Sequence, residues 1–345
     1  MNNYFVERNE KNTQYLDALL GQLPEFCEDF FIGIESRTTP LTRLNYARDL
    51  IIFFDFLTKK IQKFDGLKPN MLELKHLNSV TAQNIEKFLS YLSFYELKDK
   101  KLQNSDKAKA RKLATVRSLF KYFFNKDKLD ANVATKIEMP KIHTKEIIRL
   151  EVDEVVKLLD QTEKPTKFSP MQLQFNKHTR TRDLAILTLF LGTGIRISEL
   201  VGINMDDVDF NANSFRIVRK GGNQAILYFS DEVADALREY FEQRKLNKKT
   251  EDAALFLSLQ NKRIGVRAVE KLVKKYSLMS TPLKKITPHK LRSTYGTNLY
   301  RETGDIYMVA DVLGHKDVNT TRKHYAAISE DIRKSAANKV KLRDN

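Results

Sequence analysis

The sequence is poor in cysteine and has no long apolar run. Cys27 is the single cysteine among 345 residues, so no disulfide can form within the chain, which is typical of a reducing compartment. The longest mainly apolar run, 184–191, is far shorter than the roughly 20 residues that cross a bilayer. Residues 1–12 are polar and lack the apolar core of a signal peptide. We therefore expect a cytoplasmic protein without a membrane partner.

Recognisable metal ligands are also missing. The six histidines are scattered along the chain, and no pair of cysteine or histidine residues has the spacing of a zinc site. We expect no bound metal.

Negative charge is scarce relative to positive charge. Sixty Lys and Arg residues stand against 44 Asp and Glu residues, which gives a net charge of +16. Such an excess favours a polyanionic partner, most often nucleic acid. A merely basic surface, or attraction to anionic lipid, stays open as an alternative. The hydrophobic content of 41% and charged content of 30% are ordinary for a globular protein, and the length suits two domains with their own cores.

The first part of the sequence predicts helices. Thr39 followed by Pro40 is a typical helix start, and Thr81 is a second expected cap. A further helix, near 109–126, has an apolar stripe and a basic face. Lysine-rich faces are often only solvated, but in so basic a chain this one predicts contacts with nucleic-acid phosphates. Its candidate DNA-binding residues are Lys109, Arg111, Lys112, Arg117 and Lys121.

The helical pattern breaks near Pro140, which suggests a linker over 138–149. This divides the chain into a domain over 1–137, a domain over 150–328 and a terminal segment over 329–345. Within the second domain, the polar stretch 161–179 carries two prolines and predicts a long loop.

The second domain predicts helices around one β-hairpin. A helix over 182–191 is ended by Gly192 and Gly194, and another is expected over 196–203. Two β-prone runs within 215–229 flank Gly221 and Gly222, which predicts a hairpin.

Two polar pairs could carry chemistry. Arg196 and Glu199 lie three residues apart in one expected helix, and His289 and Arg292 do so in another. If the helix starts converge, the two arginines could hold one phosphate by forked hydrogen bonds. A structural ion pair is the alternative for either pair taken singly.

Tyr325 and Lys220 are further candidates. A phenol has a pKa near 10, so a nucleophilic tyrosine needs cations or a base nearby. Such groups surround Tyr325 in the sequence: His315, Arg322, Lys323 and His324. Lys220 lies at the expected hairpin tip, where lysines are mostly solubilising but could also act as a general acid.

Taken in order, GTGIRISEL, RKGG, HKLR and LGHKDVNTTRKHY resemble the tyrosine recombinase (phage integrase) family, and within it most closely the Xer-type recombinases of bacteria. The resemblance covers the whole chain. It implies a mostly α fold with a small β-sheet: an N-terminal helical-bundle domain that binds the core DNA site, and an α+β catalytic domain. Together they would form a C-shaped clamp on DNA.

The resemblance also implies roles for individual residues. Arg196 and Arg292 would clamp the scissile phosphate, and Glu199 would orient Arg196. His289 and His315 would hydrogen-bond the phosphate oxygens or assist proton transfer. Tyr325 would be the nucleophile, and Lys220 would protonate the leaving 5′-oxygen. No cofactor, ATP or metal is implied.

The implied partners are double-stranded DNA sites and three further copies of the chain, since the family recombines two sites in a homotetramer through a Holliday junction. An accessory protein stays unidentified. The segment after Ile328 would dock on a neighbouring protomer, unless it packs on its own domain. Chromosome-dimer resolution and mobile-element integration or excision remain open as roles. A type IB topoisomerase and a non-cutting DNA-binding protein remain alternatives.

Three positions depart from the common family pattern. Ser293 stands where relatives commonly have a histidine, and the interval from His315 to Tyr325 is one residue longer than in many relatives. The hairpin sequence KGGNQ lacks a further basic residue, so one phosphate contact is expected to be missing.

Overall fold

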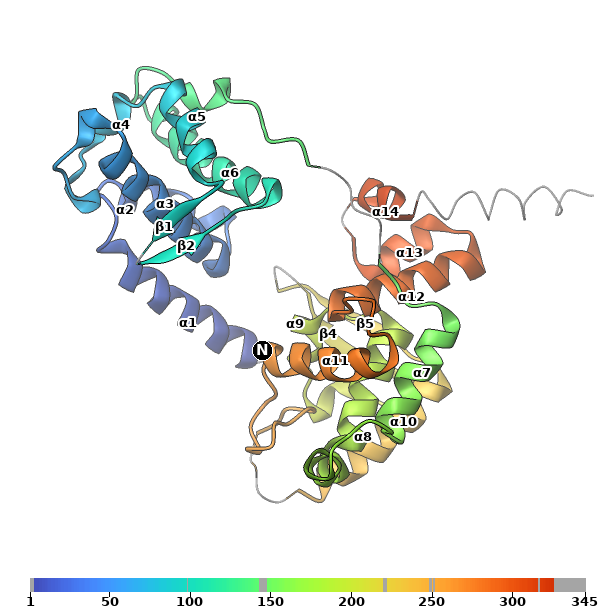
Figure 1. Ribbon diagram of the computed structural model, residues 1–345. Coiled ribbons are helices and arrows are strands. Elements are labelled where there is room, and N and C mark those ends of the chain that lie inside the picture. The colour runs from blue at the N-terminus through green and yellow to red at the C-terminus, as the bar shows by residue number, and fades with distance from the viewer. Residues whose placement is uncertain are drawn as a thin grey trace, which may run out of the picture. The chain divides into compact units, whose positions relative to one another are not determined.

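In the residues that the structure describes, the secondary structure is mostly helical with two small antiparallel sheets, which confirms the expected fold class. The computed structural model describes residues 3–97, 99–142, 148–219, 222–247, 250, 252–315 and 317–325. The chain divides into two compact units, Met1–Lys145 and Glu146–Asn345 (Figure 1). The division point lies inside the stretch 138–149 in which the sequence predicts a linker.

The N-terminal unit is a bundle of helices around α3, which packs against α1, α5 and α6 (Figure 1). As the sequence predicts, α3 begins at Pro40, and the Thr39 hydroxyl accepts a hydrogen bond from the main-chain N–H of Thr42. The regular elements are α1 (Asn3–Leu20), α2 (Cys27–Gly33), α3 (Pro40–Lys60), α4 (Leu74–Asn78), α5 (Ala82–Tyr91), β1 (Tyr95–Leu97), β2 (Lys100–Leu102) and α6 (Asp106–Phe124).

Phenylalanine dominates the core of this unit. Phe30, Phe53, Phe88 and Phe123 are completely buried, and the rings of Phe53 and Phe88 meet edge to face at 5.1 Å between centroids. Each such side chain contributes roughly 1.5–3 kcal/mol through burial. The helices are therefore held together mainly by aromatic packing.

A buried carboxylate adds a polar link between α3 and α6. Asp49 on α3 is 2% exposed. It lies 3.3 Å from the ammonium of Lys112, accepts a hydrogen bond from the Thr115 hydroxyl at 3.1 Å, and also pairs with Arg111. Lys112 is itself 5% exposed. The expectation that Lys112 belongs to a solvent-facing basic surface is therefore wrong, because its charge is committed to Asp49.

The C-terminal unit is built around α8, which packs against α7, α10 and α12. The segment of α8 from Ala185 to Phe190 is almost wholly buried. The elements are α7 (Val152–Glu163), α8 (Pro170–Thr193), α9 (Ile197–Leu200), β3 (Val208–Asp209), β4 (Ser214–Val218), β5 (Gln224–Tyr228), α10 (Asp231–Lys245), α11 (Val266–Ser280), α12 (Pro288–Thr303), α13 (Ile306–Leu313) and α14 (Val318–Tyr325).

The loop predicted over 161–179 is mostly helix instead. Helix α7 continues to Glu163, and α8 already begins at Pro170, where the Ser169 hydroxyl caps it by accepting from the main-chain N–H of Gln172. The early part of α8 has no apolar stripe, which is why periodicity missed it. It is held by polar contacts such as the 2.9 Å hydrogen bond from Asn176 to the Tyr276 hydroxyl.

The predicted hairpin is confirmed. Strands β3, β4 and β5 form an antiparallel sheet, in which Phe215 pairs with Leu227, and Val218 pairs with Gln224 next to the hairpin turn. The helix expected over 196–203 is shorter than predicted, since α9 spans only Ile197–Leu200. The residues that flank it are therefore positioned by turns.

The buried carboxylate gives a stability prediction for the N-terminal unit. Replacing Asp49 by alanine leaves the Lys112 ammonium buried without its partner, which we expect to destabilise the unit by about 3–5 kcal/mol. Thermal unfolding followed by circular dichroism measures the shift. Asp29→Ala is the matched control, because Asp29 pairs with Lys128 at the surface and should lower stability by no more than about 1 kcal/mol. Equal shifts for the two variants would contradict the interpretation.

Candidate functional site

The turn after α8 brings Arg196 into the C-terminal unit's candidate site. Gly194 ends α8 with a φ of +60°, and Arg196 precedes α9. The Arg196 guanidinium donates to Glu199 at 2.9 Å and to the main-chain carbonyl of Gly314 at 2.9 Å. The ion pair that sequence reasoning held as an alternative is thus present. The same arginine also reaches the end of α13, and its side chain is 35% exposed, so donors remain open to solvent.

Glu199 orients Arg196 by accepting hydrogen bonds from it. It is 3% exposed, and its second carboxylate oxygen accepts the main-chain N–H of Arg196 at 2.9 Å. Both oxygens therefore bind the same residue, one through its backbone and one through its side chain. This fixes Arg196 more firmly than a single surface ion pair does.

Arg292 reaches the same place from α12. It is 6% exposed, and its guanidinium donates to the carbonyl of Gly194 at 2.5 Å and to the carbonyl of Leu313. His289, one turn earlier on α12, is exposed. The two arginines that the sequence singled out thus meet around the Gly194 turn and the end of α13.

His315 lies directly after that end. Its main-chain N–H closes the last turn of α13 on the carbonyl of Ala310 at 2.9 Å. Its ring Nδ1 shares a hydrogen bond of 2.7 Å with the hydroxyl of Thr321, which is fully buried. Thr321 belongs to α14, the helix whose last residue is Tyr325. Sequence reasoning did not single out Thr321, since a threonine in a polar helix carries no distinguishing signal.

Three arginines share the carbonyls at the end of α13. Val312 accepts from Arg219 at 3.3 Å, Leu313 accepts from Arg292, and Gly314 accepts from Arg196. The last carbonyls of a helix lack partners within it and carry partial negative charge, so they suit guanidinium donors. Arg219 is the residue that sequence reasoning missed.

Two predicted site residues, Lys220 and Tyr325, cannot be placed. Lys220 lies outside the described residues, as do the side chains of Tyr325 and its neighbours Lys323 and His324. Their roles stay predictions. In the part of the chain that the structure describes, no group of three or more His, Cys, Asp or Glu residues could hold a metal ion, and no helix there is long and apolar enough to cross a membrane.

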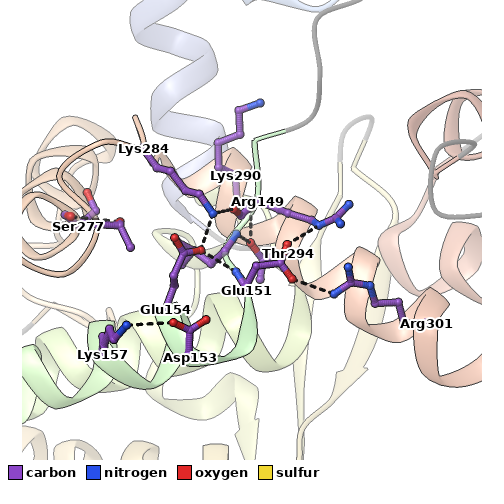
Figure 2. A network of polar contacts seen from close by, with 12 residues as sticks. Arg149, Glu151, Asp153, Glu154, Lys157, Ser277, Lys284, Lys290, Thr294 and Arg301 are labelled. Carbon is purple, nitrogen blue, oxygen red and sulfur yellow. Dashed lines mark hydrogen bonds and ion pairs between the residues drawn. The ribbon is translucent and has the colours of Figure 1, made fainter. Parts of the chain in front are cut away.

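Helix α12 is fastened to the start of α7 (Figure 2). The Thr294 hydroxyl accepts the main-chain N–H of Leu150 at 3.0 Å, and Arg301 donates to Glu151 at 3.1 Å. The two anchors lie about two turns apart on α12, both after Arg292. They hold α12, which carries His289 and Arg292, against Leu150 and Glu151.

The segment before α12 joins the same network. Lys284 donates to the Glu154 carboxylate at 2.5 Å and to the carbonyl of Arg149 at 3.1 Å (Figure 2). The hydrogen bond from Arg301, and then that from Arg149, lowers the pKa of Glu151 below its ordinary value. Glu151 therefore keeps its negative charge at neutral pH.

The basic face of α6 is less uniform than the sequence predicts. Lys109 donates to the Ser93 hydroxyl at 2.8 Å, Arg111 pairs with Asp49, and Arg117 donates to the carbonyls of Ala134 and Ile137. Of the five predicted contacts, Arg111 and Lys121 are exposed, Lys109 and Arg117 are half-buried, and Lys112 is buried.

A basic hollow lies between α2 and α6. This cavity of about 450 Å³ is lined by four cationic residues, while no carboxylate lines it among the described residues. The four are Arg37, Arg117, Lys121 and Lys126. A second cavity of the same unit, of about 1200 Å³, is lined by residues of both charge signs. The first hollow is therefore the better place for an anion such as a phosphate.

Comparisons with known proteins find relatives over most of the chain. The family model of the phage integrase family matches residues 148–331. The chain is 33% identical to the tyrosine recombinase XerC of Caldanaerobacter subterraneus subsp. tengcongensis, over 96% of this chain and 90% of that protein. It is 28% identical to the tyrosine recombinase XerD of Staphylococcus epidermidis, over 88% of this chain and 94% of that protein.

Solved structures show the same fold at low identity. A XerH site-specific recombinase bound to a palindromic difH substrate, in a post-cleavage complex, aligns with a TM-score of 0.65 at 18% identity, over 87% of this chain and 80% of that one. The Tn1549 transposon integrase in complex with circular intermediate DNA aligns with a TM-score of 0.62 at 19% identity, over 88% of this chain and 95% of that one.

The Gly194 turn gives a prediction about the site's rigidity. A Cβ at Gly194 would lie 2.5 Å from the Tyr295 ring and 2.8 Å from the Leu313 side chain. Gly194→Ala should cost about 1–2 kcal/mol for its left-handed backbone and about 1–3 kcal/mol more for displacing those side chains. Thermal unfolding measures both effects together.

Gly304→Ala is the matched control for this substitution. Gly304 also ends a helix with a positive φ, of +67°, but nothing lies within 4 Å of a Cβ built there. It should show the backbone cost alone. If the two variants lose the same stability, Gly194 does not serve the close packing of α12 and α13.

Proposed function

This chain belongs to the phage integrase family and is a tyrosine recombinase, an enzyme that breaks and rejoins DNA; from that premise we propose that it is a site-specific recombinase of the Xer type. It would act in the cytoplasm on pairs of double-stranded recombination sites. The observation that carries the proposal is the meeting of Arg196 and Arg292 at the end of α13, beside His315.

In the proposed reaction, the two arginines hold the scissile phosphate. Arg196 retains open donors while bonded to Glu199 and Gly314, so a phosphate oxygen can be bound without breaking those contacts. Positive charge placed there also stabilises the negative charge that develops in a pentacoordinate transition state. His289 and His315 supply further hydrogen bonds to the phosphate oxygens or assist proton transfer.

The covalent step transfers the phosphoryl group to the protein. The Tyr325 hydroxyl transfers its proton to a base, the role proposed for His289 or His315, and attacks phosphorus. The bond to the 5′-oxygen breaks, and Lys220 protonates that oxygen. The products are a 3′-phosphotyrosyl link and a free 5′-hydroxyl. Because the phosphodiester energy is retained in that link, a 5′-hydroxyl from a partner strand can reverse the step and reseal the DNA without ATP or a metal.

The assembly follows from the same proposal. Two sites would be held by four copies of the chain, and two rounds of strand exchange would pass through a Holliday junction. The segment after Ile328, which lies outside the described residues, would dock on a neighbouring copy and couple the subunits. The relatives named XerC and XerD favour chromosome-dimer resolution over mobile-element integration or excision as the role.

A covalent-trapping experiment tests the chemistry. We expect wild-type protein to form a protein–DNA adduct, visible in a denaturing gel, on nicked suicide duplexes that carry its site. Sites can be recovered by selecting bound fragments from random duplex pools. Tyr325→Phe should form no adduct, since it lacks the nucleophilic oxygen. Tyr307→Phe is the matched control, because Tyr307 is 71% exposed on the outside of α13.

Each other outcome points to another function. An adduct with Tyr325→Phe would show that the nucleophile assignment is wrong. Site-independent relaxation of a supercoiled plasmid would favour a type IB topoisomerase. Tight binding to a selected site without any adduct would favour a DNA-binding protein that cuts nothing.

The basic hollow of the N-terminal unit predicts how DNA affinity responds to salt. The logarithm of the binding constant should fall linearly with the logarithm of salt concentration, with a slope of about −0.9 for each phosphate contacted. Lys121→Ala should make that slope shallower by about 1. Lys59→Ala removes the same charge, but Lys59 pairs with Asp55 in the cavity of mixed charge and should leave the slope unchanged. Fluorescence anisotropy at several salt concentrations measures both, and an unchanged slope for Lys121→Ala would remove the hollow from the DNA interface.

A further inference from the structure

Arg219 crosses from the β-hairpin to α13. It follows β4 directly and is the last described residue before the hairpin tip. Its guanidinium donates to the carbonyl of Val312 at 3.3 Å. No other hydrogen bond to that guanidinium occurs among the described residues, and its Nε is buried without a partner. The main role of this side chain is therefore its contact with α13.

The guanidinium occupies space that Gly314 leaves open. A Cβ at Gly314 would lie 2.5 Å from the central carbon of the Arg219 guanidinium, closer than real atoms approach. Gly314 also has a φ of +61°, which favours glycine. Gly314 thus has two roles. Its carbonyl accepts a hydrogen bond from Arg196, and its lack of a side chain leaves room for the Arg219 guanidinium.

This contact has an electrostatic cost. Arg219 brings a third guanidinium to a helix end that already binds Arg196 and Arg292, and like charges repel. The unpartnered buried Nε–H adds a desolvation cost of its own. These costs favour a role for Arg219 other than stabilising the fold.

The backbone of Arg219 also sets the hairpin tip. Its N–H donates to the carbonyl of Asn223 at 2.7 Å, and its carbonyl accepts the N–H of Gly222 at 3.1 Å. Beyond this point one face of β5 is open to solvent, since Ile226 and Tyr228 are 54% and 69% exposed. Among the described residues, the hydrogen bond from Arg219 to Val312 is the contact with α13 that lies nearest to the hairpin tip. We call this contact the tether.

The next residue in the chain is Lys220, and consecutive Cα atoms are about 3.8 Å apart. We propose that Arg219 is a positioning residue, which ties the hairpin to the end of α13 so that Lys220 reaches the leaving 5′-oxygen of the bound DNA. The inference rests on the proposed function. It assigns to Arg219 no contact with the DNA.

A change of leaving group distinguishes a positioning role of Arg219 from a phosphate-binding or purely structural role. With sulfur in place of the bridging 5′-oxygen, the departing group is a thiolate, whose conjugate acid has a pKa near 8.5 rather than that of an alcohol. Its departure needs no general acid. A defect that arises from a misplaced Lys220 should therefore be repaired by the sulfur substrate, while a defect in phosphate binding or folding should not.

The experiment compares single-turnover adduct formation on oxygen and 5′-phosphorothiolate suicide duplexes. Arg219→Ala should cleave the oxygen substrate about 10- to 100-fold more slowly than wild type, within the roughly 10²–10⁴-fold that a general acid supplies. On the sulfur substrate the two should agree within about threefold. Lys220→Ala should show the same pattern with a larger defect, and Arg219→Lys should recover part of the loss on oxygen because it keeps the charge.

Arg216→Ala is the matched control on the same strand. Arg216 is exposed and donates to the carbonyl of Asp206 at 3.1 Å, so its side chain does not touch α13. It should cleave both substrates as wild type does. Equal losses of Arg219→Ala on oxygen and sulfur, or no loss on either, would overturn the proposal.

A measurement without DNA tests the contact between Arg219 and α13 independently of the proposed function. Hydrogen exchange of peptides covering β4–β5 and α13 should speed up in Arg219→Ala and, for α13, stay unchanged in Arg216→Ala. Unchanged exchange in Arg219→Ala would overturn the tether whether or not a cleavable site is known. Faster exchange, together with absence of any wild-type adduct on selected sites, would support the tether and refute the recombinase proposal instead.

Discussion

The carbonyls of Val312, Leu313 and Gly314 bind guanidinium groups that come from three different parts of the C-terminal unit. One arginine precedes α9, one lies at the end of β4 and one lies on α12. Because the end of a helix leaves its carbonyls unpaired, α13 offers acceptors without any polar side chain. The relative positions of the turn, the hairpin and the helix of the candidate site all depend on this one helix end.

The arrangement also reconciles charge with burial. Arg292 is almost wholly buried, and an unpaired buried charge would be strongly destabilising. The partial negative charge of the helix end and the Gly194 carbonyl compensate for it in the absence of DNA. Arg196 differs, since Glu199 neutralises it directly and solvent still reaches it. The buried arginine is thus prearranged, and the exposed one is open to a ligand.

Sequence reasoning located what short motifs encode. The helix start at Pro40, the hairpin, and the pairing of Arg196 with Glu199 follow from local signals such as caps, glycines and three-residue spacing. The meeting of Arg196 with Arg292 came from the order of four motifs and not from any one of them. Motif order carries the long-range information that propensity lacks.

What the sequence did not reveal depends on tertiary partners. The first turns of α8 have no apolar stripe and are held by contacts such as that of Asn176 with Tyr276. Lys112 belongs to a basic run, yet Asp49, far away in the sequence, draws it into the core. Arg219 was not singled out from the sequence, because its contacts with Val312 and Gly314 lie on a distant element. In each case the deciding partner lies on a different element.

The acceptors at the end of α13 are main-chain atoms, and this affects how the chain tolerates mutation. Replacement of Val312 or Leu313 by another residue keeps the carbonyl, so genetic drift at these positions cannot delete an acceptor of Arg219 or Arg292. Gly314 is the exception, because any side chain there would occupy the space of the Arg219 guanidinium. We therefore expect substitutions to be tolerated better at Val312 and Leu313 than at Gly314.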